Sequence, residues 1–273
     1  MTDGWVIKNL RTIKGRAYPR VIGAIREPSW VFFEVVLPLF TVAAFAYVYQ
    51  FMDAREELIG YVVLGGAMTA FWLNVLWSMA AQFYWEKETG NLQLFMIAPT
   101  SRMSILAGMA LGGMLSTTVN AASTLVIGAF IFNIAFDVVD PLMLVAIFLA
   151  TMVALYGMGM MFASLYMLFG REAHHLSNLL TDPVYLASGF YFPVKYLGAA
   201  VAAGASVIPI TLGLDALRQL FFTAGAEDAF LSLEAELAML VGLCAVFMVL
   251  AHYSLRHMEY LGKATGRLTL RWQ

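Results

Sequence analysis

Residues Tyr84–Leu106 read YWEKETGNLQLFMIAPTSRMSIL and form a polar passage between two long apolar runs. Leu58–Trp85 contains 28 residues without Asp, Glu, Lys or Arg, and Met103–Phe136 contains 34. A helix of about 20 apolar residues crosses a bilayer, so each run is long enough to do so. The passage between them is therefore expected to emerge at one face of a membrane.

A short helix is predicted inside this passage. Leu92, Phe95 and Met96 have the i, i+3, i+4 spacing of one helix face, and Gly90 and Pro99 bracket them as helix ends do. This pattern favours an amphipathic helix on the membrane surface, although an interfacial loop that merely joins two spans is the alternative. Two residues that can cap the following helix come next, Thr100 and Ser101.

The composition of the chain indicates a polytopic membrane protein. Of its 273 residues, 61% are hydrophobic and 12% are charged, whereas roughly a quarter of a soluble domain is charged. So little polar surface cannot enclose a soluble core. The net charge of −2 says little about partners, because the distribution of charge along a membrane protein matters more than its sum.

The N-terminal region, residues 1–29, is predicted to be an amphipathic interfacial segment. Between Trp5 and Ile25, apolar residues recur in steps of three and four with basic residues between them. Such a helix would lie on an anionic membrane surface, with an interruption near Pro19; a disordered basic leader is the alternative. The rest of the chain is expected to form one membrane domain, residues 30–255, and a basic cytoplasmic tail, residues 256–273.

Hydropathy gives seven apolar segments, of which six are predicted to cross the membrane. The predicted spans are Trp30–Met52, Leu58–Gln82, a span within Met103–Phe136, Pro141–Gly170, a span within Leu176–Val194, and Leu237–Leu255. A polar turn at Arg171–His175 separates the fourth span from the fifth. The fold class is therefore all-α, with six transmembrane helices.

The seventh segment, Gly198–Phe222, is predicted to be an extracellular re-entrant helical hairpin. It has Pro209 in its middle and carries Asp215 and Arg218 three residues apart, as a possible pair. Broken backbone at membrane depth is tolerated only where protein or water shields it. The hairpin is expected to enter from outside, between spans five and six.

Charge placement decides this count of six. The N-terminal region has six Lys and Arg residues and the tail has four, so the positive-inside rule places both termini in the cytoplasm. An even number of crossings is then required. With six spans, 13 of the 16 basic residues lie on the cytoplasmic side.

Two stretches of the chain carry a resemblance to a known family. Glu86–Leu92 has the form E-x-E-x-G-x-L, and Ala98–Arg102 follows it as A-P-T-S-R. Downstream, Ser188–Val194 reads SGFYFPV, and Pro209 stands nine residues before Arg218. These stretches resemble the loop between spans two and three of ABC-2 type transporter permeases, and the "SG-x-x-F-P" and "P-x-x-x-x-x-x-x-x-R" patterns after their fifth span.

The resemblance implies a permease subunit of an ATP-binding cassette exporter in the cell membrane. Such a subunit pairs with a second permease copy, as a homodimer or heterodimer, and binds a cytoplasmic ATPase subunit that would hold ATP and Mg. The chain itself would hold no cofactor and bind no nucleic acid. Its substrate would be hydrophobic or amphipathic: a drug, a lipid or a lipid-linked glycan. The passage would be the ATPase-coupling helix, with the residues Glu86, Glu88, Gly90, Leu92, Phe95 and Pro99.

Further residues are candidates for the translocation path or its gate. Glu34, near the cytoplasmic end of the first span, fits a gate, although it could also reach the interface or pair with Arg26. Asp182 in the fifth span is expected to line a wet path or a dimer seam, because a carboxylate facing hydrocarbon is costly. The remaining candidates at the outer side are Phe192 and Pro193, with the hairpin residues Pro209, Asp215 and Arg218.

Other chemistries lack the residues that they need. No G-x-x-x-x-G-K-[ST] motif occurs, so if ATP drives this protein, the ATPase is another chain. The histidines have no zinc spacing, and no metal site is expected. A proton-coupled secondary transporter that uses Asp182, His174 and His175 is the alternative function, although inverted repeats are not visible. A membrane scaffold or enzyme is a third possibility, without a catalytic constellation to support it.

Overall fold

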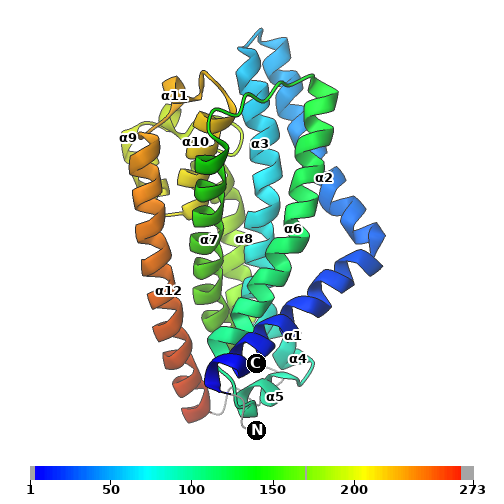
Figure 1. Ribbon diagram of the computed structural model, residues 1–273, viewed down its shortest axis with the longest axis vertical. Helices are drawn as coiled ribbons and strands as arrows, with labels where there is room; N and C mark the ends of the chain where they lie inside the picture. The colour runs from blue at the N-terminus through cyan, green and yellow to red at the C-terminus, as the bar shows by residue number, and fades with distance from the viewer. Residues whose placement is uncertain (1–3, 170, 266–273) are drawn as a thin grey trace.

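The computed structural model describes residues 4–169 and 171–265, and all secondary structure in this part is helical (Figure 1). The long helices run side by side in a bundle, and short helices close its two ends. The elements in chain order are α1 (Trp5–Arg26), α2 (Pro28–Phe51), α3 (Glu56–Leu73), the π-helix η1 (Asn74–Ala80), α4 (Gln82–Glu88), α5 (Leu92–Ile97), α6 (Arg102–Phe132), α7 (Pro141–Phe169), α8 (Arg171–Ala187), the 3-10 helix η2 (Val194–Leu197), α9 (Ala199–Ala205), α10 (Pro209–Phe221), α11 (Gly225–Asp228) and α12 (Leu233–Ala264).

Five stretches of the described chain are helical, long and apolar enough to cross a membrane. They are Val31–Phe51, Glu56–Glu88, Arg102–Phe132, Pro141–Met167 and Leu233–Ala264. These correspond to the predicted spans one to four and six, which confirms a polytopic, all-helical membrane protein. The second stretch joins α3, η1 and α4 into one helix of 33 residues, which at 1.5 Å per residue is about 50 Å long and exceeds a hydrocarbon core of about 30 Å.

The predicted fifth span is not among these five stretches. Its place is taken by α8, which runs beside α7 (Figure 1) and has only 17 residues, or about 26 Å of helix. The predicted polar turn at Arg171–His175 is wrong, because these residues form the first turns of α8. Arg, Glu and Ala all favour a helix, so polarity alone did not mark a turn. The side chain of His174 lies outside the described residues.

The predicted break near Pro209 is present. α9 and α10 are bent by 111° relative to each other, and Pro209 occupies the first turn of α10, where its missing N–H costs no hydrogen bond. A sixth apolar crossing is reached by composition only if this bent pair counts as one span. The predicted number of six membrane crossings, with the fifth within Leu176–Val194, therefore stays a prediction.

Two helix ends differ from the predicted boundaries. α6 ends at Phe132 because Asn133 adopts the left-handed conformation, with φ 51°, and terminates the helix. α12 continues to Ala264, so the first part of the predicted basic tail is helical. The tail residues Arg267 and Arg271 lie outside the described residues.

The N-terminal helix packs across α6 (Figure 1). Gly108 and Gly112 of α6 form the contact, since a methyl group on either would lie 2.6 Å and 2.8 Å from the carbonyl oxygens of Ile13 and Ala17. This is the close approach that small residues four apart permit. The predicted interruption near Pro19 is wrong, because α1 runs unbroken through it.

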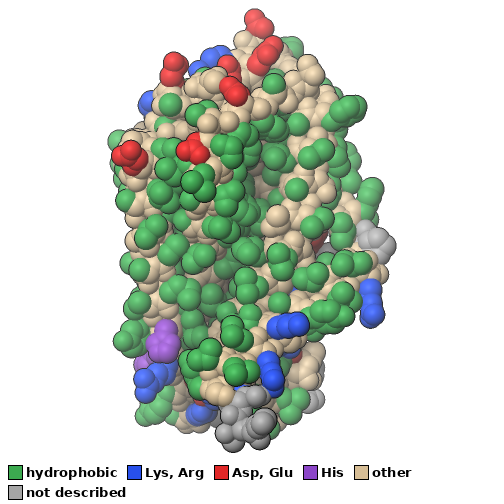
Figure 2. Space-filling model, in the orientation of Figure 1, with side chains coloured by type: hydrophobic (Ala, Val, Ile, Leu, Met, Phe, Trp, Pro, Cys, Tyr) green, Lys and Arg blue, Asp and Glu red, His purple; other side chains and the backbone are tan. Residues whose placement is uncertain are grey.

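The Glu56–Glu88 helix is the centre of the bundle. In its most apolar window 78% of the residues are buried, against 17% for α2 and for α12. α2 and α12 thus present broad apolar faces that lipid or another chain must cover. The two ends of the bundle also differ in charge, because acidic side chains gather near α11 and basic side chains near α1 and α5 (Figures 1 and 2).

We predict that Gly65→Ala destabilises the fold. A methyl group on Gly65 would lie 1.6 Å from the carbonyl oxygen of Phe190, and backbone cannot yield as a flexible side chain does. The expected loss is about 1–3 kcal/mol or more, measured as a fall in Tm of the purified protein. Gly204→Ala is the matched control, since nothing lies within 4 Å of its new methyl group. An equal Tm for Gly65→Ala and wild type would contradict this packing.

Candidate coupling loop and translocation residues

The short helix predicted in the passage is α5, and the turn before it uses a left-handed glycine. α4 ends at Glu88, and Gly90 has φ 80°, which a residue with a side chain adopts only under strain. α5 then runs to Ile97, and Pro99 follows its end. α4 and α5 lie at the basic end of the bundle (Figures 1 and 2).

The face of α5 that the sequence assigned to a partner is directed inward. Leu92 is 1% exposed and belongs to the main hydrophobic core, so its side chain is not on the surface that another chain could contact. Phe95 is half-buried and lies under the guanidinium of Arg16, 4.5 Å from its ring centroid. The outward residues are Leu94 and Ile97, which are 60% and 78% exposed.

Glu86 joins the loop to the N-terminal helix. Its carboxylate accepts a charged hydrogen bond from Arg16 at 2.6 Å and a second hydrogen bond from Gln82 at 3.0 Å. Arg20 of the same helix donates to Gln82 at 3.4 Å, and burial lowers the pKa of its guanidinium. The side chain of Glu86 is thus used inside the chain, whereas Glu88 is exposed.

The first turn of α6 is capped by a residue from α1. Ser101 occupies the predicted N-cap position, but its own hydroxyl makes no capping hydrogen bond. The side-chain oxygen of Asn9 accepts from the backbone N–H of Ser101 and from the hydroxyl of Ser104, both at 3.0 Å. A side chain of α1 therefore accepts hydrogen bonds from donors at the N-terminus of α6.

Arg102 connects the same junction to α12. It donates to the carbonyl oxygen of Met96 at 2.9 Å and forms an ion pair with Glu259 at 3.0 Å. Glu259 also contacts Lys263 at 2.6 Å. Helices α1, α4, α5, α6 and α12 thus meet around the loop.

In the opposite half of the bundle, Arg218 of α10 holds the turn within Ser188–Val194, the SG-x-x-F-P stretch. It is 2% exposed and donates to three carbonyl oxygens, those of Gly189 at 2.5 Å and of Phe190 and Phe192 at 3.3 Å. Its guanidinium also lies over the ring of Tyr61, 5.2 Å from the centroid. Arg218 has a structural role here, and Pro193 is buried beside this turn.

The expected pairing of Asp215 with Arg218 is not the arrangement found. Asp215 accepts a hydrogen bond from the backbone N–H of Phe230 at 2.7 Å. Next to it, the buried Glu236 of α12 accepts from Gln219 at 2.9 Å. Two residues that are three apart on a helix can pair. Here Arg218 donates its hydrogen bonds to the carbonyl oxygens of Gly189, Phe190 and Phe192 instead of to Asp215.

A charged cluster fastens the acidic end of the bundle. Asp228 of α11 is almost fully buried and accepts hydrogen bonds from Arg55 at 2.8 Å, Tyr196 at 2.5 Å and Tyr61 at 3.1 Å. Burial opposes ionisation of Asp228, but the three hydrogen bonds outweigh it and hold the pKa of its carboxyl below the ordinary value. The cluster joins α3, the turn before α9, and α11.

Glu34 and Asp182 lie in different surroundings. Glu34 of α2 is half-buried, accepts a hydrogen bond from Asn120 of α6, and lines a groove of about 750 Å³ between α2 and the central helix. Asp182 of α8 is exposed and has the exposed residues Leu179 and Leu186 three before and four after it. Its carboxylate therefore shares a helix face with apolar side chains.

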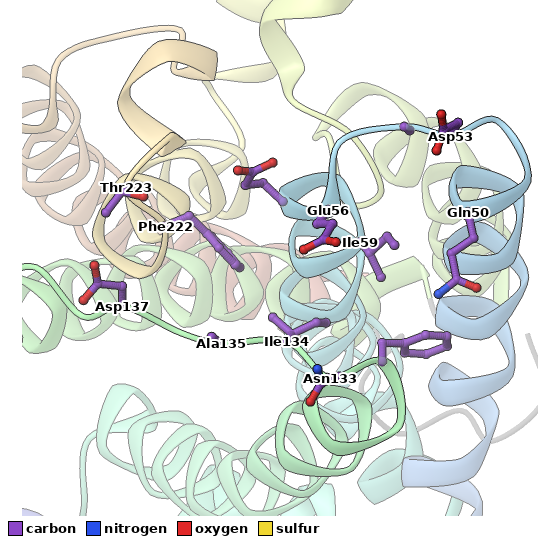
Figure 3. A pocket seen from close by; sticks show the side chains of 13 residues that line it. Gln50, Asp53, Glu56, Ile59, Asn133, Ile134, Ala135, Asp137, Phe222 and Thr223 are labelled. Carbon is purple, nitrogen blue, oxygen red and sulfur yellow. The ribbon is translucent and has the colours of Figure 1, made fainter.

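A second pocket, of about 560 Å³, opens at the acidic end (Figure 3). It lies between the end of α2, the start of α3, the segment after α6 and the end of α10. Figure 3 shows Glu56 and Asp137 on different walls, with Phe222 and Ile134 between them. Among the described residues, no group of three His, Cys, Asp or Glu side chains is placed to hold a metal ion.

These features define a class of protein: a helical, multi-pass membrane protein with a compact loop structure at its basic end and a broken helical hairpin at its acidic end. The family model for the ABC-2 type transporter matches residues 20–222. This match covers more than half of the chain, so the chain belongs to the ABC-2 type transporter family. A comparison with curated proteins gave no match.

Several residues of these sites escaped the sequence reasoning. Asn9 and Arg16 lie within the predicted surface helix, and the sequence gives no indication of their partners in the loop and in α6. In the cluster around Asp228, Tyr61 precedes Asp228 by 167 residues in the sequence and Arg55 precedes it by 173. A single sequence carries no signal of such pairing.

We predict that the Asp228 cluster stabilises the fold at neutral pH and ceases to do so in acid. Because the folded-state pKa is below the ordinary value of 3.8, the contribution is complete above that value and is lost as the pH falls through the lowered pKa. The Tm of Asp228→Asn should therefore be below that of wild type at about pH 7 and approach it at about pH 3. Asp53→Asn, an exposed carboxylate at the same end, is the control. A Tm difference independent of pH would contradict the ion-pair explanation.

Proposed function

We propose that this chain is the membrane-spanning permease subunit of an ATP-binding cassette exporter, powered by a separate ATPase chain. The match to the ABC-2 type transporter family carries the proposal. The chain has no phosphate-binding G-x-x-x-x-G-K-[ST] motif, so ATP and Mg would be bound by the partner. The exposed apolar faces of α2 and α12 leave area for a second permease copy and for lipid.

Within this proposal, the loop Glu86–Pro99 receives the motion of the ATPase. Its outward face offers Leu94 and Ile97, while Glu86, Leu92 and Phe95 hold the loop to the rest of the chain. A movement of α5 would pass into α4, the last part of the central helix, and through Asn9 and Arg16 into α1. Glu34, Asp182, Phe192 and Pro193 are then candidates for the path or its gates, and the α9–α10 hairpin would close its outer side.

The basic end of the bundle is proposed to face the cytoplasm, together with both termini. Lys and Arg gather there and acidic residues gather at the other end (Figure 2), as the positive-inside rule requires. The transported compound would be hydrophobic or amphipathic, as the family resemblance implies.

We predict that Leu94→Ala/Ile97→Ala releases the ATPase. Burial of each exposed side chain in a partner contributes roughly 1.5–3 kcal/mol, so the double variant should bind at least about tenfold more weakly. The chain is purified from its native membrane, and the amount of ATP-binding chain that accompanies it is measured with ATP hydrolysis. Val138→Ala/Val139→Ala, an exposed pair at the acidic end, is the control.

Leu92→Ala separates contact from folding. It should open a cavity in the core, lower the free energy of unfolding by about 2–5 kcal/mol and so lower the Tm. Partner binding should fall only as far as this loss of stability reduces the folded protein. If no ATPase accompanies the wild-type chain, the proposed function fails. If the double variant retains its partner, α5 is not the contact.

We also predict which positions are reachable from outside the cell. Single cysteines at Glu57, Val139 and Glu227, introduced in a Cys244→Ala background, should react with an impermeant maleimide in intact cells. A cysteine at Thr265 should react only after permeabilisation, because the basic end faces inward. Labelling of Thr265→Cys in intact cells would refute this orientation.

A further inference from the structure

Two carboxyl side chains meet inside the protein, between the α9–α10 hairpin and α12. Asp215 of α10 is 2% exposed and Glu236 of α12 is 0% exposed, and the two side chains lie within hydrogen-bond reach of each other. α10 and α12 pack together at this level, close to α11 (Figure 1). Two ionised acids in contact are costly here, because like charges repel strongly where water is excluded.

Helix packing brings these two acids together. Asp215 and Gln219 are four residues apart on α10 and therefore lie on one face of that helix. Gln219 donates to Glu236 at 2.9 Å and to the carbonyl oxygen of Leu231 at 3.1 Å. Asp215, one turn earlier, accepts from the backbone N–H of Phe230 at 2.7 Å. Both side chains thus hold α12 and the segment before it, so the fold itself directs Asp215 to Glu236.

One oxygen of Glu236 lacks a hydrogen-bond donor. Its Oε2 accepts from Gln219, whereas its buried Oε1 has no hydrogen-bond partner among the described residues. Gln219 cannot serve Oε1, because both hydrogens of its amide nitrogen are already used. An ionised carboxylate is costly to bury in this state. A proton on either acid removes the cost, since a protonated carboxyl donates its O–H to the other carboxylate.

The charges around the two acids balance one negative charge and not two. The guanidinium of Arg218 attracts the carboxylate of Asp215, but a second charge, on Glu236, has no such counterpart in the described part of the chain. α7, which packs along α12, has no Asp, Glu, Lys, Arg or His at positions 141–169. The other charged side chains near α11 are exposed or bound elsewhere: Arg55, Lys195, Glu227, Asp228 and Glu234.

We propose that Asp215 and Glu236 share one proton and that this proton fastens the α9–α10 hairpin to α12. The proton belongs to the pair and not to one residue, as in other coupled carboxyl groups. The pair then carries a single negative charge, which Arg218 balances. When the proton leaves at alkaline pH, two carboxylates repel each other and α10 loses a contact with α12. This site goes beyond the proposed function and does not depend on an ATPase.

An infrared spectrum tests for the proton directly. The full chain is measured in dodecyl maltoside, a detergent without a carbonyl group, because a protonated carboxyl has a C=O stretching band of its own. We expect this band at neutral pH and its loss on alkaline titration. Glu236→Gln and Asp215→Asn should each remove it, because the new amide supplies a donor without a shared proton. Glu234→Gln changes an exposed carboxylate two residues away on the same helix and should keep the band.

The thermal stability of the same samples gives an independent measurement. The folded chain holds a proton that the unfolded chain releases at neutral pH, so the stability of the wild type falls as the pH rises. Between about pH 7 and pH 9, the Tm of the wild type should fall by up to roughly 10 °C more than that of Glu236→Gln. Glu234→Gln should follow the wild type.

Three results would overturn the proposal. The first is the absence of a protonated-carboxyl band from the wild type at neutral pH, which needs no variant to be observed. The second is a band that persists in Asp215→Asn, because burial alone would then protonate Glu236. The third is an equal dependence of Tm on pH in the wild type and in Glu236→Gln.

Discussion

A carbonyl group in a buried turn has no intrahelical hydrogen-bond partner, and the fold meets this constraint with Arg218. The turn at positions 189–192 directs three carbonyl oxygens at one buried guanidinium, which can donate five hydrogen bonds in a planar fork. The motif proline and the arginine nine residues later therefore belong together physically: Pro209 starts a helix, and Arg218, in the last turn of that helix, reaches back to the turn. Without that arginine the carbonyls would lose these hydrogen bonds, at a cost of about 1–3 kcal/mol for each group left buried and unsatisfied.

The central helix connects this turn with the loop at the basic end. At Gly65 its backbone touches Phe190, and at Glu86, more than 20 residues later, its carboxylate contacts Arg16. The two ends are joined by one continuous apolar element that includes a π-helix, a form often found at functional positions. A rigid element that contacts both regions is the kind of structure through which separate sites are coupled.

The sequence predicted the apolar elements well and their contacts poorly. The helices at 58–85 and 103–136 were predictable because hydropathy depends only on local composition. The broken hairpin was predictable for a similar reason, since Pro209 breaks a helix locally. Leu92 was assigned to a partner because helical spacing shows that a face is apolar but not what covers it. The predicted span within Leu176–Val194 overlaps α8, which is short and partly polar. The contacts of Asn9 and Asp228 depend on chain segments that no local pattern relates. Helices and breaks were thus predictable, whereas the tertiary partners of polar side chains were not.

The cap that Asn9 gives to α6 has a consequence for biosynthesis. Its two hydrogen-bond partners lie 92 and 95 residues further along the chain, so α1 leaves the ribosome long before the groups that fix it exist. Two apolar helices, α2 and the Glu56–Glu88 helix, must be made in the meantime. The docking of the first helix is consequently a late event of assembly. The junction around α5 becomes complete only when α12, the last helix that the structure describes, brings Glu259 to Arg102.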